Sequence, residues 1–268
     1  MEQESASACA KPVRIAEAFV HVGTSGWHYK HWLGDFYPPR FPPANMLAWY
    51  AREFHTVEIN NSFYRLPEAK TFEQWGRIVP PGFVFAVKAS RYITHIKRLK
   101  DPEDSIKLFF SRAKYLGQHL GPVLFQLPPK WKADLERLEQ FLALLPKGQQ
   151  FVIEFRDESW YRQEVCELLR RHNVALCLHD WASAQWSREL TANFTYIRFH
   201  GSTGKYAGDY PDHLLHEWAK QIEGWCGQVK EVFAYFNNDV GGHAIRNARS
   251  LRAMLEKVTQ ENSVRSAA

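Results

Sequence analysis

The sequence lacks several features that would place a protein in a class at once. Its four cysteines, Cys9, Cys166, Cys177 and Cys226, form no CxxC pair and no dense cluster, which argues against a zinc ribbon or a disulfide framework. No apolar run is long enough to cross a bilayer, and the first residues carry charges where a signal peptide would be apolar. We therefore expect a cytoplasmic protein without membrane contact.

Neither positive nor negative charge is in large excess. The chain has 34 Lys and Arg against 29 Asp and Glu, a net charge of +5. This balance is compatible with an anionic ligand and too weak to predict nucleic-acid binding by itself. Aromatic residues, in contrast, make up 15% of the chain. Trp27, Trp32, Trp160 and Trp181 fall in predicted loops after strands, where they either form a stacking wall for a sugar or base or simply pack.

Short apolar runs rich in β-branched and aromatic residues predict eight strands. These runs are Phe19–Thr24, the stretch Thr56–Ile59 around Glu58, Phe83–Lys88, Val123–Leu127, Phe151–Arg156, Val174–His179, Thr195–His200 and Val232–Phe236. Helices or loops alternate with them, and eight such units predict a single closed (β/α)8 barrel of the TIM type over residues 19–258. A disordered tail is expected at 1–18 and a polar tail at 259–268. The alternative, an open doubly wound sheet, would usually carry a GxGxxG dinucleotide fingerprint after the first strand. Gly23 and Gly26 do not match that fingerprint, and the cofactor stays unassigned.

Active sites of such barrels lie at the C-terminal ends of the strands. Polar residues at or near those ends are Glu58, Asn60, Lys88, Gln126, Glu154, Arg156, His179, Asp180, Arg198, His200, Asn237 and Asn238. Residues two apart on a strand share a face, so Glu154 and Arg156 point the same way, as do Arg198 and His200. The bulky residues between and beside them, Ile153, Phe155, Ile197 and Phe199, then take the face towards the helices. We expect the polar set to converge at the barrel mouth.

Roles follow from the residue types. The candidates for proton transfer are Glu58, Glu154 and His200. The candidates for substrate binding are Lys88, Arg156, Arg198, Asn60, Gln126, Asn237 and Trp27. The structural alternative is that Glu58 is a buried acid paired with Lys88, and that Glu154 and Arg156 belong to an ion-pair network without catalysis.

Two loops, and the question of a metal site, leave further alternatives open for ligand binding. Gly201–Gly204 directly follows His200, and its backbone N–H groups can bind an anion together with Arg198, or the loop is merely solvated. His95 lies among basic side chains and either reaches an anion or is an ordinary loop residue. Metal-ligand residue types are present among the strand ends, but no HxH or HExxH spacing supports a divalent metal.

Several segments together resemble the family called domain of unknown function 72, or YecE-like. They are Gly23–Trp27, Phe36–Pro38, Thr56–Asn60, Phe63–Tyr64, Phe85–Lys88, Thr94–His95, Gly121–Pro129, Glu154–Arg156, Ser159–Trp160, Arg198–Gly201 and Tyr235–Asp239. The segments run in order through nearly the whole chain. The resemblance implies a TIM-type barrel and no established activity.

The sequence thus supports an uncharacterised enzyme, of hydrolase, lyase or isomerase type, acting on an anionic, phosphate-bearing small molecule. The alternative from another class is a nucleic-acid-binding module that uses a basic rim and aromatic loops. A third interpretation is a barrel without catalysis that binds a protein partner.

Overall fold

The computed structural model describes residues 10–179, 189–203 and 206–267, with side chains described through Glu261. Its strands form one curled sheet in the order β1-β2-β9-β8-β7-β6-β5-β4-β3. The strands are β1 (Val13–Ile15), β2 (Ala18–Thr24), β3 (Thr56–Ile59), β4 (Val84–Lys88), β5 (Leu120–Gln126), β6 (Phe151–Glu154), β7 (Ala175–His179), β8 (Phe194–Phe199) and β9 (Glu231–Phe236). Strand β1 pairs with β2 antiparallel, and the other pairings are parallel.

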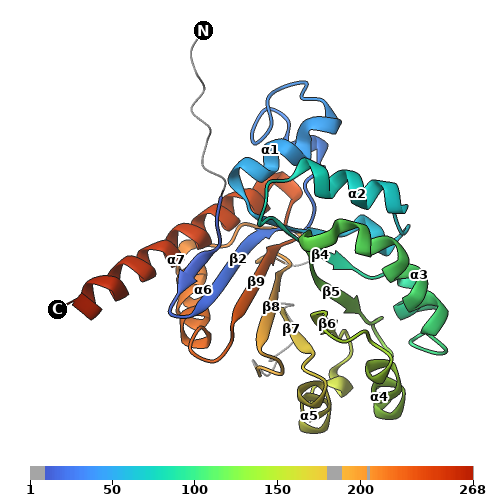
Figure 1. Ribbon diagram of the computed structural model, residues 1–268. Coiled ribbons are helices and arrows are strands. Elements are labelled where there is room, and N and C mark those ends of the chain that lie inside the picture. The colour runs from blue at the N-terminus through green and yellow to red at the C-terminus, as the bar shows by residue number, and fades with distance from the viewer. Residues whose placement is uncertain (1–9, 180–188, 204–205, 268) are drawn as a thin grey trace.

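Helices connect the parallel strands and lie around the curled sheet (Figure 1). They are α1 (Met46–Glu53), α2 (Ala69–Ile78), α3 (Glu103–Ala113), α4 (Leu135–Ala143), α5 (Gln163–Arg171), α6 (Asp212–Trp225) and α7 (His243–Ala267). Short turns follow several strands, including the 3-10 turns Asn61–Phe63 and Glu158–Trp160 and the π-helical turn Tyr92–Ile96. These turns lie next to the C-terminal strand ends, where the predicted site residues are.

The two faces of the sheet have different contents. One face belongs to a large apolar core that it shares with the helices, and Ile153, Phe155, Ile197 and Phe199 all lie in it, as predicted. The other face carries a small cluster that includes Ala86, Leu124, Val152, Cys177, Tyr196 and Tyr235. Two residues further along the same strands, and so on this same face, stand Lys88, Gln126, Glu154, His179, Arg198 and Asn237. The alternation of side chains therefore sends the polar groups to the inner face.

Strands β2 and β3, at opposite ends of the parallel series, approach each other. Ser25 forms an isolated parallel bridge with Glu58. Gly23 lies so close to β3 that a Cβ atom on it would overlap the Thr56 carbonyl oxygen. The backbones can come this close only because residue 23 has no side chain.

The prediction of an α/β chain with parallel strands is confirmed, and each of the eight predicted strands overlaps an observed one. The ends differ from the prediction. Strand β1 lies within the stretch 1–18 that was expected to be disordered, and α7 continues past residue 258 to Ala267. Part of the connection between β7 and β8 lies outside the described residues. No helix among the described residues is long and apolar enough to cross a membrane.

Candidate functional site

A buried network of alternating negative and positive side chains lies at the C-terminal ends of β3, β6 and β8. Arg198 donates through Nη2 to Glu58 Oε1 at 2.8 Å and through Nη1 to Glu154 Oε2 at 2.7 Å. All three residues have 0% exposure. Each carboxylate is thus paired with a cation in a dry environment, which offsets the cost of burying it.

Glu58 is saturated with donors. Ser25 Oγ donates to its Oε1 at 2.7 Å, and the Tyr196 hydroxyl donates to its Oε2 at 2.6 Å. With Arg198, three separate elements hold this one carboxylate. A carboxylate so enclosed stabilises the junction of β2, β3 and β8 and has no route to a ligand in this conformation.

Glu154 links the buried Glu58–Arg198 pair to Arg156. Gln126 Nε2 donates to its Oε1 at 2.9 Å, and Arg156 forms an ion pair with the same oxygen. Burial alone would raise the pKa of Glu154, but Arg156 and Arg198 hold that pKa well below its usual range. Glu154 is therefore ionised at any ordinary pH and orients the two guanidinium groups.

His200 contacts the same terminal nitrogen of Arg156 that pairs with Glu154. Arg156 Nη2 donates to His200 Nε2 at 2.9 Å. Burial, together with Arg198, lowers the pKa of His200 well below its usual range, so the ring is neutral and can accept this bond. Arg156 is thus held by a carboxylate and an imidazole, and it lines a cavity together with Gln126.

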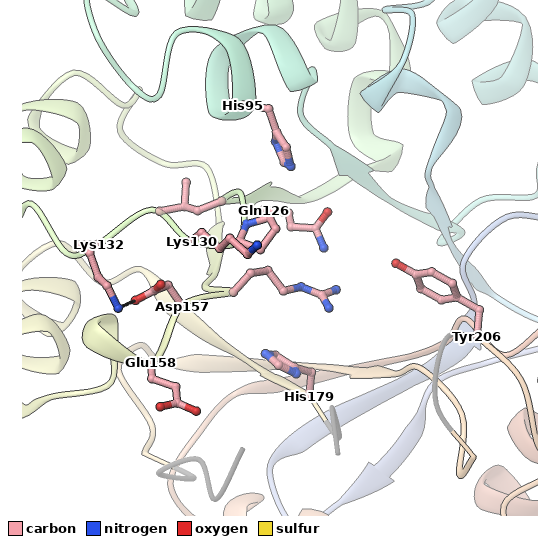
Figure 2. A pocket seen from close by; sticks show the side chains of 11 residues that line it. His95, Gln126, Lys130, Lys132, Asp157, Glu158, His179 and Tyr206 are labelled. Carbon is pink, nitrogen blue, oxygen red and sulfur yellow. Dashed lines mark ion pairs between the residues drawn. The ribbon is translucent and has the colours of Figure 1, made fainter. Parts of the chain in front are cut away.

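The cavity has a volume of about 500 Å³ and opens at the C-terminal ends of β5, β6 and β7. Its lining residues are His95, Gln126, Leu127, Pro129, Lys130, Lys132, Arg156, Asp157, Glu158, His179 and Tyr206. Figure 2 shows His95, Gln126, His179 and Tyr206 directed from different elements towards one space. Lys132 Nζ lies 3.4 Å from Asp157 Oδ1. Three permanent cations against two carboxylates give the cavity a positive balance.

Two histidines of the cavity are neutral at physiological pH. Burial, with the cations Lys88 and Arg91, lowers the pKa of His95 to about 4, and burial lowers the pKa of His179 to about 4. His179 Nε2 lies 3.3 Å from the Phe155 carbonyl oxygen and 3.2 Å from the Tyr161 hydroxyl, and a proton on Nε2 satisfies the carbonyl contact. A neutral imidazole in this state can accept a proton.

Lys88 does not pair with Glu58, so the structural alternative for that lysine is wrong. Glu58 takes Arg198 as its cation instead. Within the described part of the chain the Lys88 ammonium makes no hydrogen bond or ion pair, and it lies 4.2 Å from the centroid of the Phe63 ring. Burial, with the neighbouring Arg198, lowers the pKa of Lys88 to about 8.

A second cavity of about 400 Å³ lies beyond the C-terminal ends of β2 and β3. Trp27 and Asn60, both predicted to bind substrate, line this cavity rather than the first. The Trp27 and Trp75 rings meet edge to face there, with centroids 5.2 Å apart. Asn237, at the end of β9, is buried and lines neither cavity.

Comparison with known proteins assigns the chain to a family. A family model described as "Protein of unknown function DUF72" matches residues 21–267. The chain belongs to the DUF72 family. The UPF0759 protein YunF of Bacillus subtilis (strain 168) is 28% identical over 277 residues, covering 88% of this chain and 95% of YunF. The UPF0759 protein YecE of Escherichia coli (strain K12) is 27% identical over 145 residues, covering 53% of this chain and 50% of YecE.

Solved structures of DUF72 proteins have the same fold. A DUF72 family protein from Thermotoga maritima superimposes with a TM-score of 0.79 at 30% identity, covering 88% of this chain and 99% of the other. One from Enterococcus faecalis V583 has a TM-score of 0.78 at 20% identity, covering 88% of this chain and 95% of the other. The family resemblance read from the sequence motifs is therefore confirmed, and it carries no assigned activity.

Within this DUF72 chain, two predicted anion contacts are corrected. Arg198 was expected to bind substrate, but it is fully buried and its two terminal nitrogens donate to Glu58 and Glu154. The backbone N–H groups of residues 201–204 were candidates for binding an anion, but the Gly201 amide donates to the Tyr210 hydroxyl at 2.7 Å. Asp180 lies outside the described residues. The buried carboxylates of Glu58 and Glu154 already occupy both terminal nitrogens of Arg198, so these nitrogens are not directed at a ligand.

Several cavity residues are not among the predicted roles. Lys130, Lys132, Asp157 and Glu158 stand a few residues beyond the ends of β5 and β6, and Tyr206 follows the loop after β8. Extending the search past each strand into the following loop would have found them, because those loops form the mouth of such folds. Among the described residues, no group of three His, Cys, Asp or Glu side chains is arranged to hold a metal ion.

Proposed function

We propose that this protein is an enzyme that binds an anionic, phosphate-bearing small molecule in the cavity around Arg156 and transfers a proton within it. The observation that carries the proposal is the pairing, in one cavity of about 500 Å³, of a rigidly held guanidinium with two neutral imidazoles. A fixed cation and a proton acceptor in one cavity are the groups that acid–base chemistry on a bound anion requires.

Arg156 is the proposed anchor for the phosphate. Glu154 and His200 both bind its guanidinium, so its orientation is set before a ligand arrives. A planar guanidinium presents several parallel N–H donors that match phosphate oxygens. Lys130 and Lys132 add positive charge at the same cavity.

His179 is the proposed proton acceptor, with His95 as the second basic group. In this proposal the Nε2 proton of His179 is directed at the Phe155 carbonyl oxygen, and Nδ1 is the nitrogen that accepts the proton. Glu58 and Glu154 were predicted to transfer protons, and we now assign both to positioning because neither has exposed surface. Replacing Glu154 by Gln should then weaken phosphate binding through Arg156, which separates this role from direct proton transfer.

The scaffold for this site is, in our proposal, a closed (β/α)8 barrel. The Ser25–Glu58 bridge and the close approach of Gly23 to Thr56 support closure between β2 and β3. The hydrogen bond from Ser25 Oγ to Glu58 crosses the same junction. Closure would bring the two cavities to one end of a single barrel.

The test is a thermal-shift panel on the full-length protein. The panel contains inorganic phosphate, sugar phosphates, nucleotides, divalent metals with a chelator control, and short DNA and RNA oligomers. A ligand at about 100 times its Kd adds about 2.7 kcal/mol, which corresponds to roughly 5–10 °C for a chain of this size. We expect such a shift with a phosphorylated small molecule, its loss in Arg156→Gln, and its retention in Arg77→Gln, which removes an exposed arginine on α2.

The other outcomes are equally informative. A shift seen only with oligomers and abolished by salt would replace the proposal with the nucleic-acid-binding alternative. A shift that survives in Arg156→Gln would place the anion elsewhere. The absence of any shift across the panel would contradict the proposal.

A further inference from the structure

The second cavity has no role in the function proposed above. We propose that it is a binding subsite for a neutral, planar ring belonging to the same substrate, so that the substrate is an aryl or nucleoside phosphate. The inference rests on the proposed function for the phosphate half. The proposal that a ring binds in the second cavity is argued from the residues that line this cavity and from its position.

The lining is aromatic and uncharged. Its residues are Gly26, Trp27, His28, Tyr29, Pro43, Asn60, Asn61 and Trp75, with no Asp, Glu, Lys or Arg among them. Trp27 and Trp75 meet edge to face at 90°, and Trp75, the less buried of the two, offers the cavity an aromatic wall. Stacking on such a wall recognises a π-face, and the amides of Asn60 and Asn61 each supply a donor and an acceptor for a ring edge. A phosphate would find no cation here.

The cavity is preformed. The Tyr29 hydroxyl donates to the Ser25 carbonyl oxygen at 2.6 Å, and the Tyr37 hydroxyl donates to the Trp27 carbonyl oxygen. Gly26 has a φ of +98°, and a Cβ atom there would press against the Tyr29 ring. The loop after β2 is thus locked in a conformation that requires glycine, and a ligand need not order it on binding.

The 3-10 turn Asn61–Phe63 links the linings of the two cavities. Asn61 lines the second cavity and begins the 3-10 turn Asn61–Phe63. Phe63 ends that turn, and its ring packs against His95 of the first cavity with centroids 4.9 Å apart. A ring in the second cavity and a phosphate in the first would therefore lie on the two sides of this turn. A sugar or another short linker would pass over it.

The experiment compares ligands that share the phosphate and differ in the ring. Calorimetric titrations of the full-length protein use adenosine and uridine 5′-monophosphates, phenyl phosphate, ribose 5-phosphate, inorganic phosphate and the two free nucleosides. We expect at least one ring-bearing phosphate to bind about tenfold or more tightly than ribose 5-phosphate, since stacking one ring supplies that much affinity. Trp75→Leu should remove this ratio and leave ribose 5-phosphate binding intact.

The matched control is Trp218→Leu, which removes a partly buried tryptophan from α6, outside both cavities. That variant should keep the full ratio. Equal affinities for ribose 5-phosphate and all ring-bearing phosphates would overturn the subsite, as would a ratio that survives in Trp75→Leu. The absence of binding by every nucleoside and ring-bearing phosphate would overturn it as well.

The two proposals fail in different ways. If Arg156→Gln leaves phosphate binding unchanged while ring binding still depends on Trp75, the anion site is wrong and the ring subsite stands. If Arg156→Gln abolishes phosphate binding while the ring adds nothing, the anion site stands and the ring subsite is wrong.

Discussion

Glu58 and Arg198 form a fully buried ion pair, and replacing Glu58 should show how much this pair contributes to stability. Glu58→Gln keeps the shape of the side chain but removes one of the two carboxylates that balance Arg198. Breaking a buried pair leaves an uncompensated charge, which typically costs about 3–5 kcal/mol. We expect a decrease of that size in the free energy of unfolding, measured by urea denaturation.

An exposed glutamate provides the control. Glu17→Gln removes the partner of Arg14 in a surface pair, where Glu17 is 91% exposed, and should leave the free energy of unfolding nearly unchanged. Equal midpoints for the two variants would show that Glu58 is solvated in solution. The structural alternative drawn from the sequence named Lys88 as the partner of Glu58 and missed Arg198, which lies 140 residues away in the chain.

At the scale of elements, the close approach of β2 to β3 requires glycine at position 23. Gly23→Ala would drive a methyl group into the Thr56 carbonyl oxygen, and such overpacking typically costs about 1–3 kcal/mol. We expect that loss of stability in urea denaturation.

Gly224→Ala is the control, because Gly224 lies in α6 with open space around it and alanine favours a helix by up to about 1 kcal/mol. A neutral Gly23→Ala would mean that β2 and β3 are apart in solution.

The strands could be predicted because their own residues determine them. Apolar β-branched runs with polar ends gave all eight parallel strands, and the two-residue alternation placed Phe155 and Phe199 against the helices and Glu154 and Arg198 inside. The loops could not be predicted in the same way. Whether Lys88 pairs with Glu58, or Asn60 shares a cavity with Arg156, depends on how the sheet curls, and no local pattern encodes that curvature.

For the molecule as a whole, the histidines predict sensitivity to acid. The pKa values of His55, His95, His179 and His200 all lie below the ordinary value of 6.5, each chiefly because of burial. Above pH 6.5 these rings are neutral in both the folded and the unfolded protein. As the pH falls below 6.5, the unfolded chain takes up protons that the folded protein excludes, so the free energy of unfolding should decrease towards pH 4.

His55 offers the sharpest test of this acid sensitivity, because it contacts His21 and lines neither cavity. Each buried histidine contributes up to about 1.4 kcal/mol per pH unit to the slope, so His55→Asn should flatten the decrease by up to that amount and leave ligand binding unchanged. His213→Asn, at an exposed position on α6, should leave the slope as it is. The measurement is urea denaturation between pH 4.5 and pH 7.5, roughly the window around the unfolded pKa. A free energy of unfolding that stays constant across this range would show that the buried imidazoles titrate with the same pKa values in the folded protein as in the unfolded chain.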